Sequence, residues 1–229
     1  MDKKYFKTGI DVSSYQGIID WNAVRASGIE FAILKIIKKD LNPDKRFETN
    51  WKGCTQAGIP IQGVYNYSYA TTVKKAETDA GKVLEILNGR RTMVWLDVED
   101  DCQKKLGATL VALIHAYKAV VEGAGLPFGV YTGTYFYKDY IKPYGDLDCP
   151  LWIARYGKNT GAMDVKYRPQ LPGMIGWQYT SKGRVNGIAG DVDMDVWYEE
   201  VDIRKDESGA GDTGKCCESQ RSCCQQRNC

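Results

Sequence analysis

The sequence predicts an α/β fold, a modified TIM-like barrel of five β/α units closed by three further strands. Eight short β-prone runs occur within about 200 residues, and the first five alternate with segments of helical periodicity. Strands that alternate with helices indicate a parallel sheet, and eight such strands suggest that the sheet closes on itself. An open doubly wound sheet is the alternative, but no glycine-rich phosphate loop follows the first run.

The five β/α units are expected between residues 8 and 141. Their strands are predicted at 8–12, 31–37, 61–67, 93–99 and 128–132. Asp20 is expected to cap the first helix, because its side chain can accept hydrogen bonds from the free amides of a first turn. The second helix should start near Pro43, since proline suits a first turn. The third should run from about Thr72 to Leu87 with one apolar face.

The fourth helix should place its apolar side chains on one face and end before Gly123. These side chains are Leu110, Leu113, Ile114, Tyr117 and Val121. The only histidine, His115, falls on the opposite, solvated face. A histidine-based triad and most catalytic zinc sites are therefore not expected. A short helical piece at 135–141 should follow the fifth strand.

The last three strands are expected at 151–155, 175–179 and 192–196, joined by loops too short for full helices. From Lys205 onward Ser, Gly, Asp, Gln, Arg and Cys dominate, so we predict one domain over 1–204 and a disordered tail over 205–229. Five of the eight cysteines lie in this tail, where adjacent cysteine pairs do not match the usual spacing of zinc ligands. No metal and no cofactor is predicted.

Composition argues against several classes of partner. The 31 basic and 29 acidic residues leave a net charge of +2, so no nucleic-acid partner is expected. No apolar run approaches the roughly 18 residues that a membrane span needs. The charged first seven residues are not followed by an apolar segment, so no secretory signal is visible. A soluble monomer that does not bind membranes is expected.

The fourth strand ends in two carboxylates, Asp97 and Glu99. Because side chains alternate along a strand, residues two apart point to the same face. Two acids on one face of a buried strand repel each other and resist burial, and acid/base work on a substrate is the usual reason to keep them. The alternative is a strand that ends in water.

Further acids are expected at the same end of the barrel. Asp11 lies near the end of the first strand, and Asp193 lies in the last strand or its entry, beside the point of closure. Active sites of such barrels form at the carboxyl ends of the strands, so these acids should converge with Asp97 and Glu99 across the mouth. Asp191 and Asp195 flank Asp193, and one of them could support it.

Aromatic residues recur at the same strand ends. They are Tyr65, Tyr67, Tyr131, Trp152, Trp177 and Tyr179. An acidic cleft lined by flat rings suits a sugar, whose C–H faces stack on rings while its hydroxyls bond to carboxylates. For Tyr65 and Tyr179 core packing is the favoured interpretation.

With these acids and aromatic residues, the chain resembles glycoside hydrolase family 25, the Chalaropsis-type lysozymes. The resemblance covers residues 8–198 in order and rests on seven segments: Gly9-Ile10-Asp11-Val12-Ser13-Ser14-Tyr15-Gln16-Gly17 followed by Ile19-Asp20-Trp21, Gly63-Val64-Tyr65-Asn66-Tyr67-Ser68-Tyr69-Ala70, Leu96-Asp97-Val98-Glu99, Gly129-Val130-Tyr131-Thr132-Gly133, Leu151-Trp152-Ile153-Ala154-Arg155-Tyr156, Gly176-Trp177-Gln178-Tyr179 and Val192-Asp193. It implies a barrel of five β/α units closed by three strands.

The resemblance also implies roles for the site residues. Glu99 would be the general acid at the bond between N-acetylmuramic acid and N-acetylglucosamine, with its pKa raised by Asp97 and by burial. Asp97, Asp11 and Asp193 would stay ionised and orient the sugar or a water. The sugar and its acetamido group would be held by Tyr67, Tyr131, Trp152, Trp177 and Gln178.

The stereochemical outcome stays open. Two residues along a strand separate α-carbons by roughly 6.6 Å, between the close carboxyl pair of retaining enzymes and the wider pair of inverting ones. The resemblance favours retention with the substrate's acetamido group as nucleophile.

Two other functions remain as alternatives. A chitinase of family 18 would carry a longer acidic pattern before Asp97, and this pattern is absent. A non-catalytic barrel that binds peptidoglycan or chitin is opposed by the intact Asp97 and Glu99. The resemblance implies bacterial peptidoglycan as partner and action at the cell wall, by a secreted or phage-released enzyme.

Overall fold

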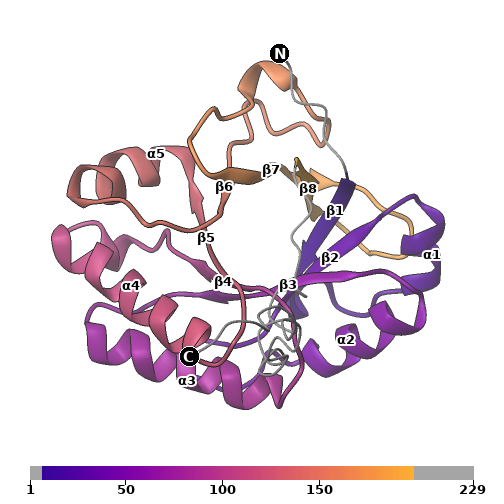
Figure 1. Ribbon diagram of the computed structural model, residues 1–229. Helices are drawn as coiled ribbons and strands as arrows, with labels where there is room; N and C mark the ends of the chain where they lie inside the picture. The colour runs from indigo at the N-terminus through magenta and orange to yellow at the C-terminus, as the bar shows by residue number, and fades with distance from the viewer. Residues whose placement is uncertain (1–6, 199–229) are drawn as a thin grey trace, which may run out of the picture.

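Eight strands close into a barrel in the computed structural model, which describes residues 7–198 (Figure 1). They are β1 (Lys7–Val12), β2 (Phe31–Lys35), β3 (Ile61–Tyr67), β4 (Val94–Asp97), β5 (Phe128–Gly133), β6 (Leu151–Ala154), β7 (Met174–Gly183) and β8 (Val192–Trp197). Each strand pairs with its neighbours in chain order, and β8 pairs with β1. The predicted barrel is confirmed.

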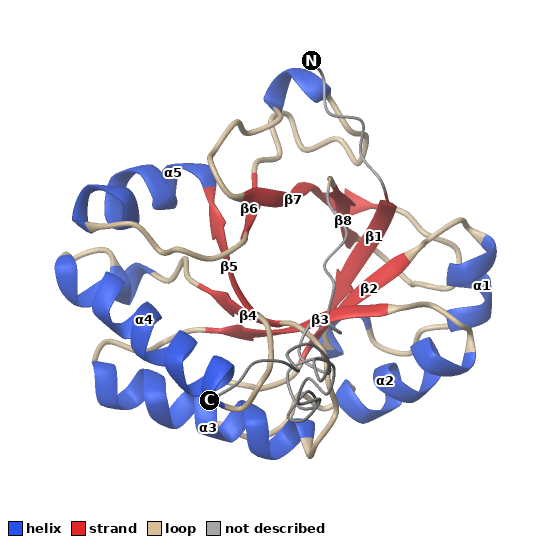
Figure 2. Cartoon of the chain, viewed as in Figure 1, coloured by secondary structure: helices blue, strands red, loops and turns tan. Residues whose placement is uncertain are grey.

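Helices cover the outside of the first five units, as Figure 2 shows. They are α1 (Trp21–Ala26), α2 (Phe47–Gln56), α3 (Val73–Leu87), α4 (Ala108–Gly123) and the short α5 (Thr134–Phe136). Asp20 caps α1 as predicted, and the hydroxyl of Thr72 caps α3. The predicted start of the second helix near Pro43 is wrong by four residues. The carboxylate of Asp44 instead accepts hydrogen bonds from the Ser14 hydroxyl and the Arg46 amide, which holds this segment as a loop.

As expected, the connections after β6 and β7 contain no full helix. For the connection between β6 and β7, the reason differs from the predicted one. Residues 155–173 between β6 and β7 are numerous enough for a helix, yet their only helical piece is the 3₁₀ turn Val165–Tyr167. The expectation that this connection is too short is therefore wrong. The connection instead folds over the end of the barrel, where Tyr156 and Tyr167 border a pocket described below.

The direction of β8 decides where its acids lie. The pairs from β1–β2 through β6–β7 are parallel, whereas β8 is antiparallel to both β7 and β1. The start of β8 therefore lies beside the end of β1, and Asp193 is the register partner of Asp11. An acid at the entry of the last strand thus reaches the same end of the barrel as acids at the exits of the others.

Large rings pack against glycines inside the barrel. The buried rings are Phe31, Trp95, Trp152 and Trp197. A Cβ added at Gly63 would lie 2.6 Å from Trp95, and one added at Gly129 would overlap the same ring. At these glycines the strands approach the central rings more closely than a side chain would allow. This packed layer forms the floor beneath the site.

The hydropathy of the helices and the state of the cysteines complete the description of the fold. Within residues 7–198 no helix is long and apolar enough to cross a membrane. In the same part of the chain Cys54, Cys102 and Cys149 are free thiols. The predicted tail over 205–229 and the boundary at residue 204 lie outside the described residues.

Candidate active site

A cavity of about 170 Å³ opens at the carboxyl end of the barrel. Its walls come from every strand that ends there, and the lining residues are Asp11, Lys35, Tyr65, Tyr67, Asp97, Glu99, Tyr131, Trp152, Tyr156, Gln178 and Asp193. The structure thus brings together the four acids that the sequence placed at strand ends. Such a concentration of acids in one cavity is typical of a catalytic site.

Asp97 and Glu99 share this cavity, although only Asp97 lies in β4. Glu99 lies two residues beyond the end of the strand and keeps the orientation that the alternation predicts. Burial is the first cause that raises the pKa of both carboxyls. The charge of Glu99 raises the pKa of Asp97 further, and the charges of Asp193 and then Asp100 raise that of Glu99. The charge of Lys35 lowers the pKa of both carboxyls.

Asp11, Asp193 and Asp195 form a second acidic group on β1 and β8. Burial and then the charges of Asp193 and Asp195 raise the pKa of Asp11 well above its usual value. Burial raises the pKa of Asp193 to about 6. Burial and the mutual charges of these acids thus oppose the ionised state expected of Asp11, Asp97 and Asp193.

Asp195 supports this group from below. Its side chain is fully buried, and its Oδ1 accepts a 2.8 Å hydrogen bond from Nε1 of Trp152. Asp191, the other candidate, pairs with Arg184 at 2.8 Å and is half exposed. The supporting acid is therefore Asp195.

Gln178 connects the acids to the tyrosines. Its Oε1 accepts hydrogen bonds from the hydroxyls of Tyr131, at 2.7 Å, and Tyr156, at 2.6 Å. Its Nε2 donates to Oδ2 of Asp11 at 2.6 Å. Because both ends of the amide are engaged, its orientation is determined. A buried network of this kind holds its members in one geometry.

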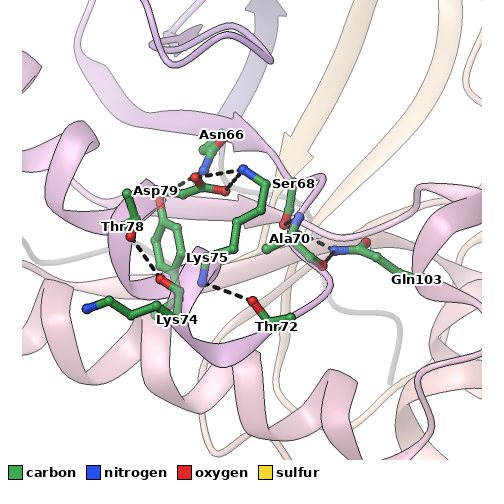
Figure 3. Close-up of polar contacts among 10 residues, drawn as sticks. Asn66, Ser68, Ala70, Thr72, Lys74, Lys75, Thr78, Asp79 and Gln103 are labelled. Carbon is green, nitrogen blue, oxygen red and sulfur yellow. Dashed lines mark hydrogen bonds and ion pairs between the residues drawn. The ribbon is translucent and has the colours of Figure 1, made fainter.

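The segment that carries Glu99 is fastened on both sides. The Val98 amide donates to the Tyr131 carbonyl at 2.9 Å, and the Thr132 hydroxyl donates to the Val98 carbonyl at 2.6 Å. On the other side, the buried amide of Gln103 donates to the Ser68 hydroxyl and the Ala70 carbonyl, both at 3.1 Å (Figure 3). Glu99 is thus held in place although it lies outside a strand.

The predicted sugar-binding residues divide into two groups. Tyr67, Tyr131, Trp152 and Gln178 line the cavity, with Trp152 in its floor at 1% exposed. Trp177 does not: it is buried outside the barrel against Tyr179 and donates from Nε1 to the Arg155 carbonyl at 2.9 Å. Because neighbours in a strand point to opposite faces, the inward Gln178 forces Trp177 outward. Its prediction as a substrate-binding residue is corrected accordingly.

Two lining residues, Lys35 and Tyr156, were not predicted from the sequence, and Tyr65 has a second role. Lys35 ends the apolar run of β2, and its Nζ lies 5.6 Å from the ring centre of Tyr65 and 5.5 Å from that of Tyr67. A single lysine at the end of a buried strand can be recognised from the sequence as a candidate site residue. Tyr65 packs against the core cluster as predicted, and its alternation with Tyr67 also places it in the cavity lining. Tyr156 lies in a loop, where no periodicity points to it.

Two further pockets flank the cavity and extend it into a groove. One, of about 480 Å³, is lined by Glu99, Gly133, Thr134, Tyr135, Phe136, Ala154, Arg155, Tyr156, Gly157 and Tyr167. The other, which we call the lysine pocket, has about 350 Å³ and is lined by Ser13, Ser14, Tyr15, Lys35, Ile37, Lys38, Lys39, Asp44, Tyr67 and Tyr69. Each shares two residues with the cavity.

Within residues 7–198 no group of His, Cys, Asp and Glu side chains is arranged to hold a metal ion.

Comparison with known proteins gives consistent matches. A model of the family described as Glycosyl hydrolases family 25 matches residues 10–188. The autolytic lysozyme of Clostridium acetobutylicum is 32% identical over 200 residues, which cover 84% of this chain and 56% of that protein. The chain thus spans little more than half the length of this relative.

Solved structures agree in fold. The catalytic domain of an endolysin from bacteriophage P40 of Listeria monocytogenes has a TM-score of 0.72 at 25% identity, over 85% of this chain and 94% of that one. A modular autolysin from Streptococcus pneumoniae, solved in complex with a synthetic peptidoglycan ligand, has a TM-score of 0.68 at 28% identity. That match covers 84% of this chain and 46% of the autolysin.

Proposed function

Since the chain belongs to the glycosyl hydrolases of family 25, we propose that it is a lysozyme acting on bacterial peptidoglycan. The bond cleaved is the β-1,4 linkage between N-acetylmuramic acid and N-acetylglucosamine. The observation that carries the proposal is the presence of the buried Asp97 and the partly buried Glu99 in one cavity. The names of the relatives support it, as does the peptidoglycan ligand of the pneumococcal autolysin. We expect the enzyme to act at the cell wall.

Glu99 is the proposed general acid. A carboxyl that donates a proton to the leaving oxygen must hold that proton at the working pH. Burial and the charges of Asp193 and Asp100 raise the pKa of Glu99, which favours its protonated form. Glu99 also borders the 480 Å³ pocket, so its carboxyl can reach a bond that spans the two spaces.

Asp97 is the proposed partner that orients the substrate. Its Oδ1 is buried and has no hydrogen-bond partner among the described residues. An acceptor in that state suits a donor brought by the substrate, and the N–H of an acetamido group supplies one. Once oriented, the acetamido oxygen would attack the anomeric carbon as the leaving oxygen takes the proton from Glu99. Asp11 and Asp193 would stabilise the positive charge that develops on the sugar ring.

Glu99→Gln tests the assignment. The amide keeps the shape of the side chain and cannot donate a proton as an acid, so lytic activity should fall by about 10²–10⁴-fold. The measurement is zymography on bacterial walls with soluble chitin in parallel. Asp101→Asn is the control, because Asp101 is exposed and pairs with Lys104 at the surface. An undiminished lytic band with Glu99→Gln would refute the acid, and equal cleavage of chitin would refute the substrate class.

Product analysis separates the two stereochemical outcomes. With a defined muropeptide, attack by the acetamido group gives the β-anomer first, because two inversions restore the configuration. NMR of the earliest product measures the ratio of anomers. An initial α-anomer would contradict the role proposed for Asp97.

A further inference from the structure

We propose that the lysine pocket binds the carboxylates of the peptide that muramic acid carries. The proposal rests on the proposed function and deepens it, since it names the part of peptidoglycan that a second site recognises. Muramic acid bears a lactyl ether whose carboxyl is amide-linked to a short peptide, and that peptide ends in free carboxylates. A sugar held in the cavity would therefore carry an anionic arm into a neighbouring space.

The lysine pocket adjoins the cavity that would hold the sugar. It shares Lys35 and Tyr67 with the catalytic cavity, so a ligand can extend from one space into the other without leaving the groove. Its volume of about 350 Å³ exceeds that of the cavity itself. This size suits a few residues of extended peptide rather than a single ion.

The charge of the lysine pocket fits an anion. Three of its lining residues are lysines, Lys35, Lys38 and Lys39, against one acid, Asp44. Asp44 is buried, and its two carboxylate oxygens already accept hydrogen bonds from the Ser14 hydroxyl and the Arg46 amide. These hydrogen bonds stabilise the charge of Asp44 within the protein, so Asp44 repels a bound anion less than an unpaired carboxylate would.

The lysines themselves keep donors for a ligand. Lys38 forms one ion pair, at 2.9 Å, with the exposed Asp40. An ammonium has three N–H donors, so this pair leaves others available. Lys39 lies with its Nζ 4.2 Å from the ring centre of Tyr69 and is exposed, and its charge also acts on Asp100 nearby. Charge-assisted hydrogen bonds from such groups to carboxylates are stronger than those to neutral sugar hydroxyls.

The opposite end of the groove differs in character. The 480 Å³ pocket contains one cation, Arg155, whose guanidinium lies over the ring of Tyr167, and it also contains Glu99. Its other side chains are mainly aromatic. The groove is therefore basic on one side of the acids and aromatic on the other. A neutral polymer such as chitin has no group that would use this asymmetry, whereas a glycan with a peptide on every second sugar does.

The experiment compares glycan strands with and without their peptides. Purified strands are used as isolated or after an amidase has removed all peptides, and the release of reducing ends gives kcat/KM for each. The wild type should prefer the peptide-bearing strands. The double variant Lys38→Met, Lys39→Met keeps the apolar stems and removes both charges. Its preference, the ratio of the two kcat/KM values, should fall roughly three- to tenfold, mainly through KM.

A matched lysine serves as control. Lys82 is 35% exposed and pairs with Glu85 on α3, much as Lys38 is 31% exposed and pairs with Asp40. Lys82→Met should keep the wild-type preference. An unchanged ratio in the double variant, or a wild type without preference, would overturn the peptide site.

Failure of the proposed function has a separate signature. A wild type that releases no reducing ends from either substrate would overturn the lysozyme activity. Binding would then test the peptide site. The Glu99→Gln variant should be retained more strongly on peptide-bearing strands than on bare strands. Adding Lys38→Met and Lys39→Met to this variant should remove the difference. Equal retention on both strands would contradict the peptide site.

Discussion

Gln178 donates a 2.6 Å hydrogen bond from Nε2 to Oδ2 of Asp11, and this bond joins β7 to β1 across the intervening strand β8. It lies at the only place in the described barrel where the parallel order is interrupted. The same amide accepts from two tyrosine hydroxyls on β5 and after β6. One side chain thus coordinates residues from three parts of the cavity wall.

Gln178→Leu should therefore lower both stability and activity. The change removes three hydrogen bonds, two from tyrosine hydroxyls and one to the Asp11 carboxylate, which we expect to cost about 2–3 kcal/mol of unfolding free energy. kcat/KM should fall about 10–100-fold, because Asp11 loses the donor that lowers its pKa. Urea unfolding and turbidity loss of bacterial walls measure the two effects. Gln56→Leu, at an exposed position of α2, should stay within about 0.5 kcal/mol. An unfolding midpoint equal to the wild type would show that the network does not contribute.

Lys35→Met should shift the alkaline limb of the pH profile upward. The charge of Lys35 lowers the pKa values of Glu99 and Asp97, so its removal raises them. A general acid with a higher pKa stays protonated to higher pH. The limb of kcat/KM should therefore move to higher pH, by less than about one unit because other causes dominate.

The control for this shift is charge-conserving. Lys35→Arg should keep the wild-type limb, and Lys104→Met, which removes an exposed lysine paired with Asp101, should also keep it. Movement of the limb to lower pH in Lys35→Met would contradict the electrostatic role of Lys35.

The acids of this site could be predicted because strand geometry alone determines them. Asp97 and Glu99 follow from the two-residue repeat, and Asp11 from its position at a strand end. Asp193 required in addition that the last strand begin at the same end, which the antiparallel direction of β8 provides. The same alternation explains Trp177, because the inward Gln178 beside it turns the Trp177 ring away from the cavity.

Other features depend on contacts that the sequence does not encode locally. Tyr156 lies in the loop after β6 and lines the cavity, where it bonds to Gln178, 22 positions away. The start of α2 depends on Asp44, which Ser14 engages from a distant loop. The lysine pocket likewise combines segments after β1, β2 and β3. Such sites arise only when the barrel closes.

Gly129→Ala should destabilise the barrel. An added Cβ would overlap the ring of Trp95, which is fully buried and cannot move away. We expect a loss of about 1–3 kcal/mol in unfolding free energy. Gly81→Ala is the matched control, because Gly81 lies on the exposed face of α3 with open space around its Cβ. There alanine should stabilise by about 0.5–1 kcal/mol, since it favours the helix. Equal effects of the two changes would contradict the packing of rings against glycines.

Asp193 should make the protein less stable as pH rises from about 4 to 6. Its pKa is 3.8 in an exposed reference state and about 6 when folded, so the folded protein binds more protons in this range. Stability falls with pH wherever the folded state binds more protons than the unfolded one. The shift corresponds to about 1–3 kcal/mol that is present below pH 4 and lost above pH 6.

Asp193→Asn should remove this dependence and raise the unfolding free energy at pH 7 relative to the wild type, while catalysis falls because the developing positive charge loses a carboxylate. Denaturant unfolding at pH 4, 5, 6 and 7 measures the first effect. Asp164→Asn is a suitable control, because Asp164 is largely solvated and its pKa is lowered by Lys166 rather than raised. A variant less stable than the wild type at pH 7, with the same slope between pH 4 and 6, would contradict the burial cost assigned to Asp193. The opposite result would mean that the barrel keeps Asp193 at the expense of stability, as expected of a group retained for the proposed chemistry.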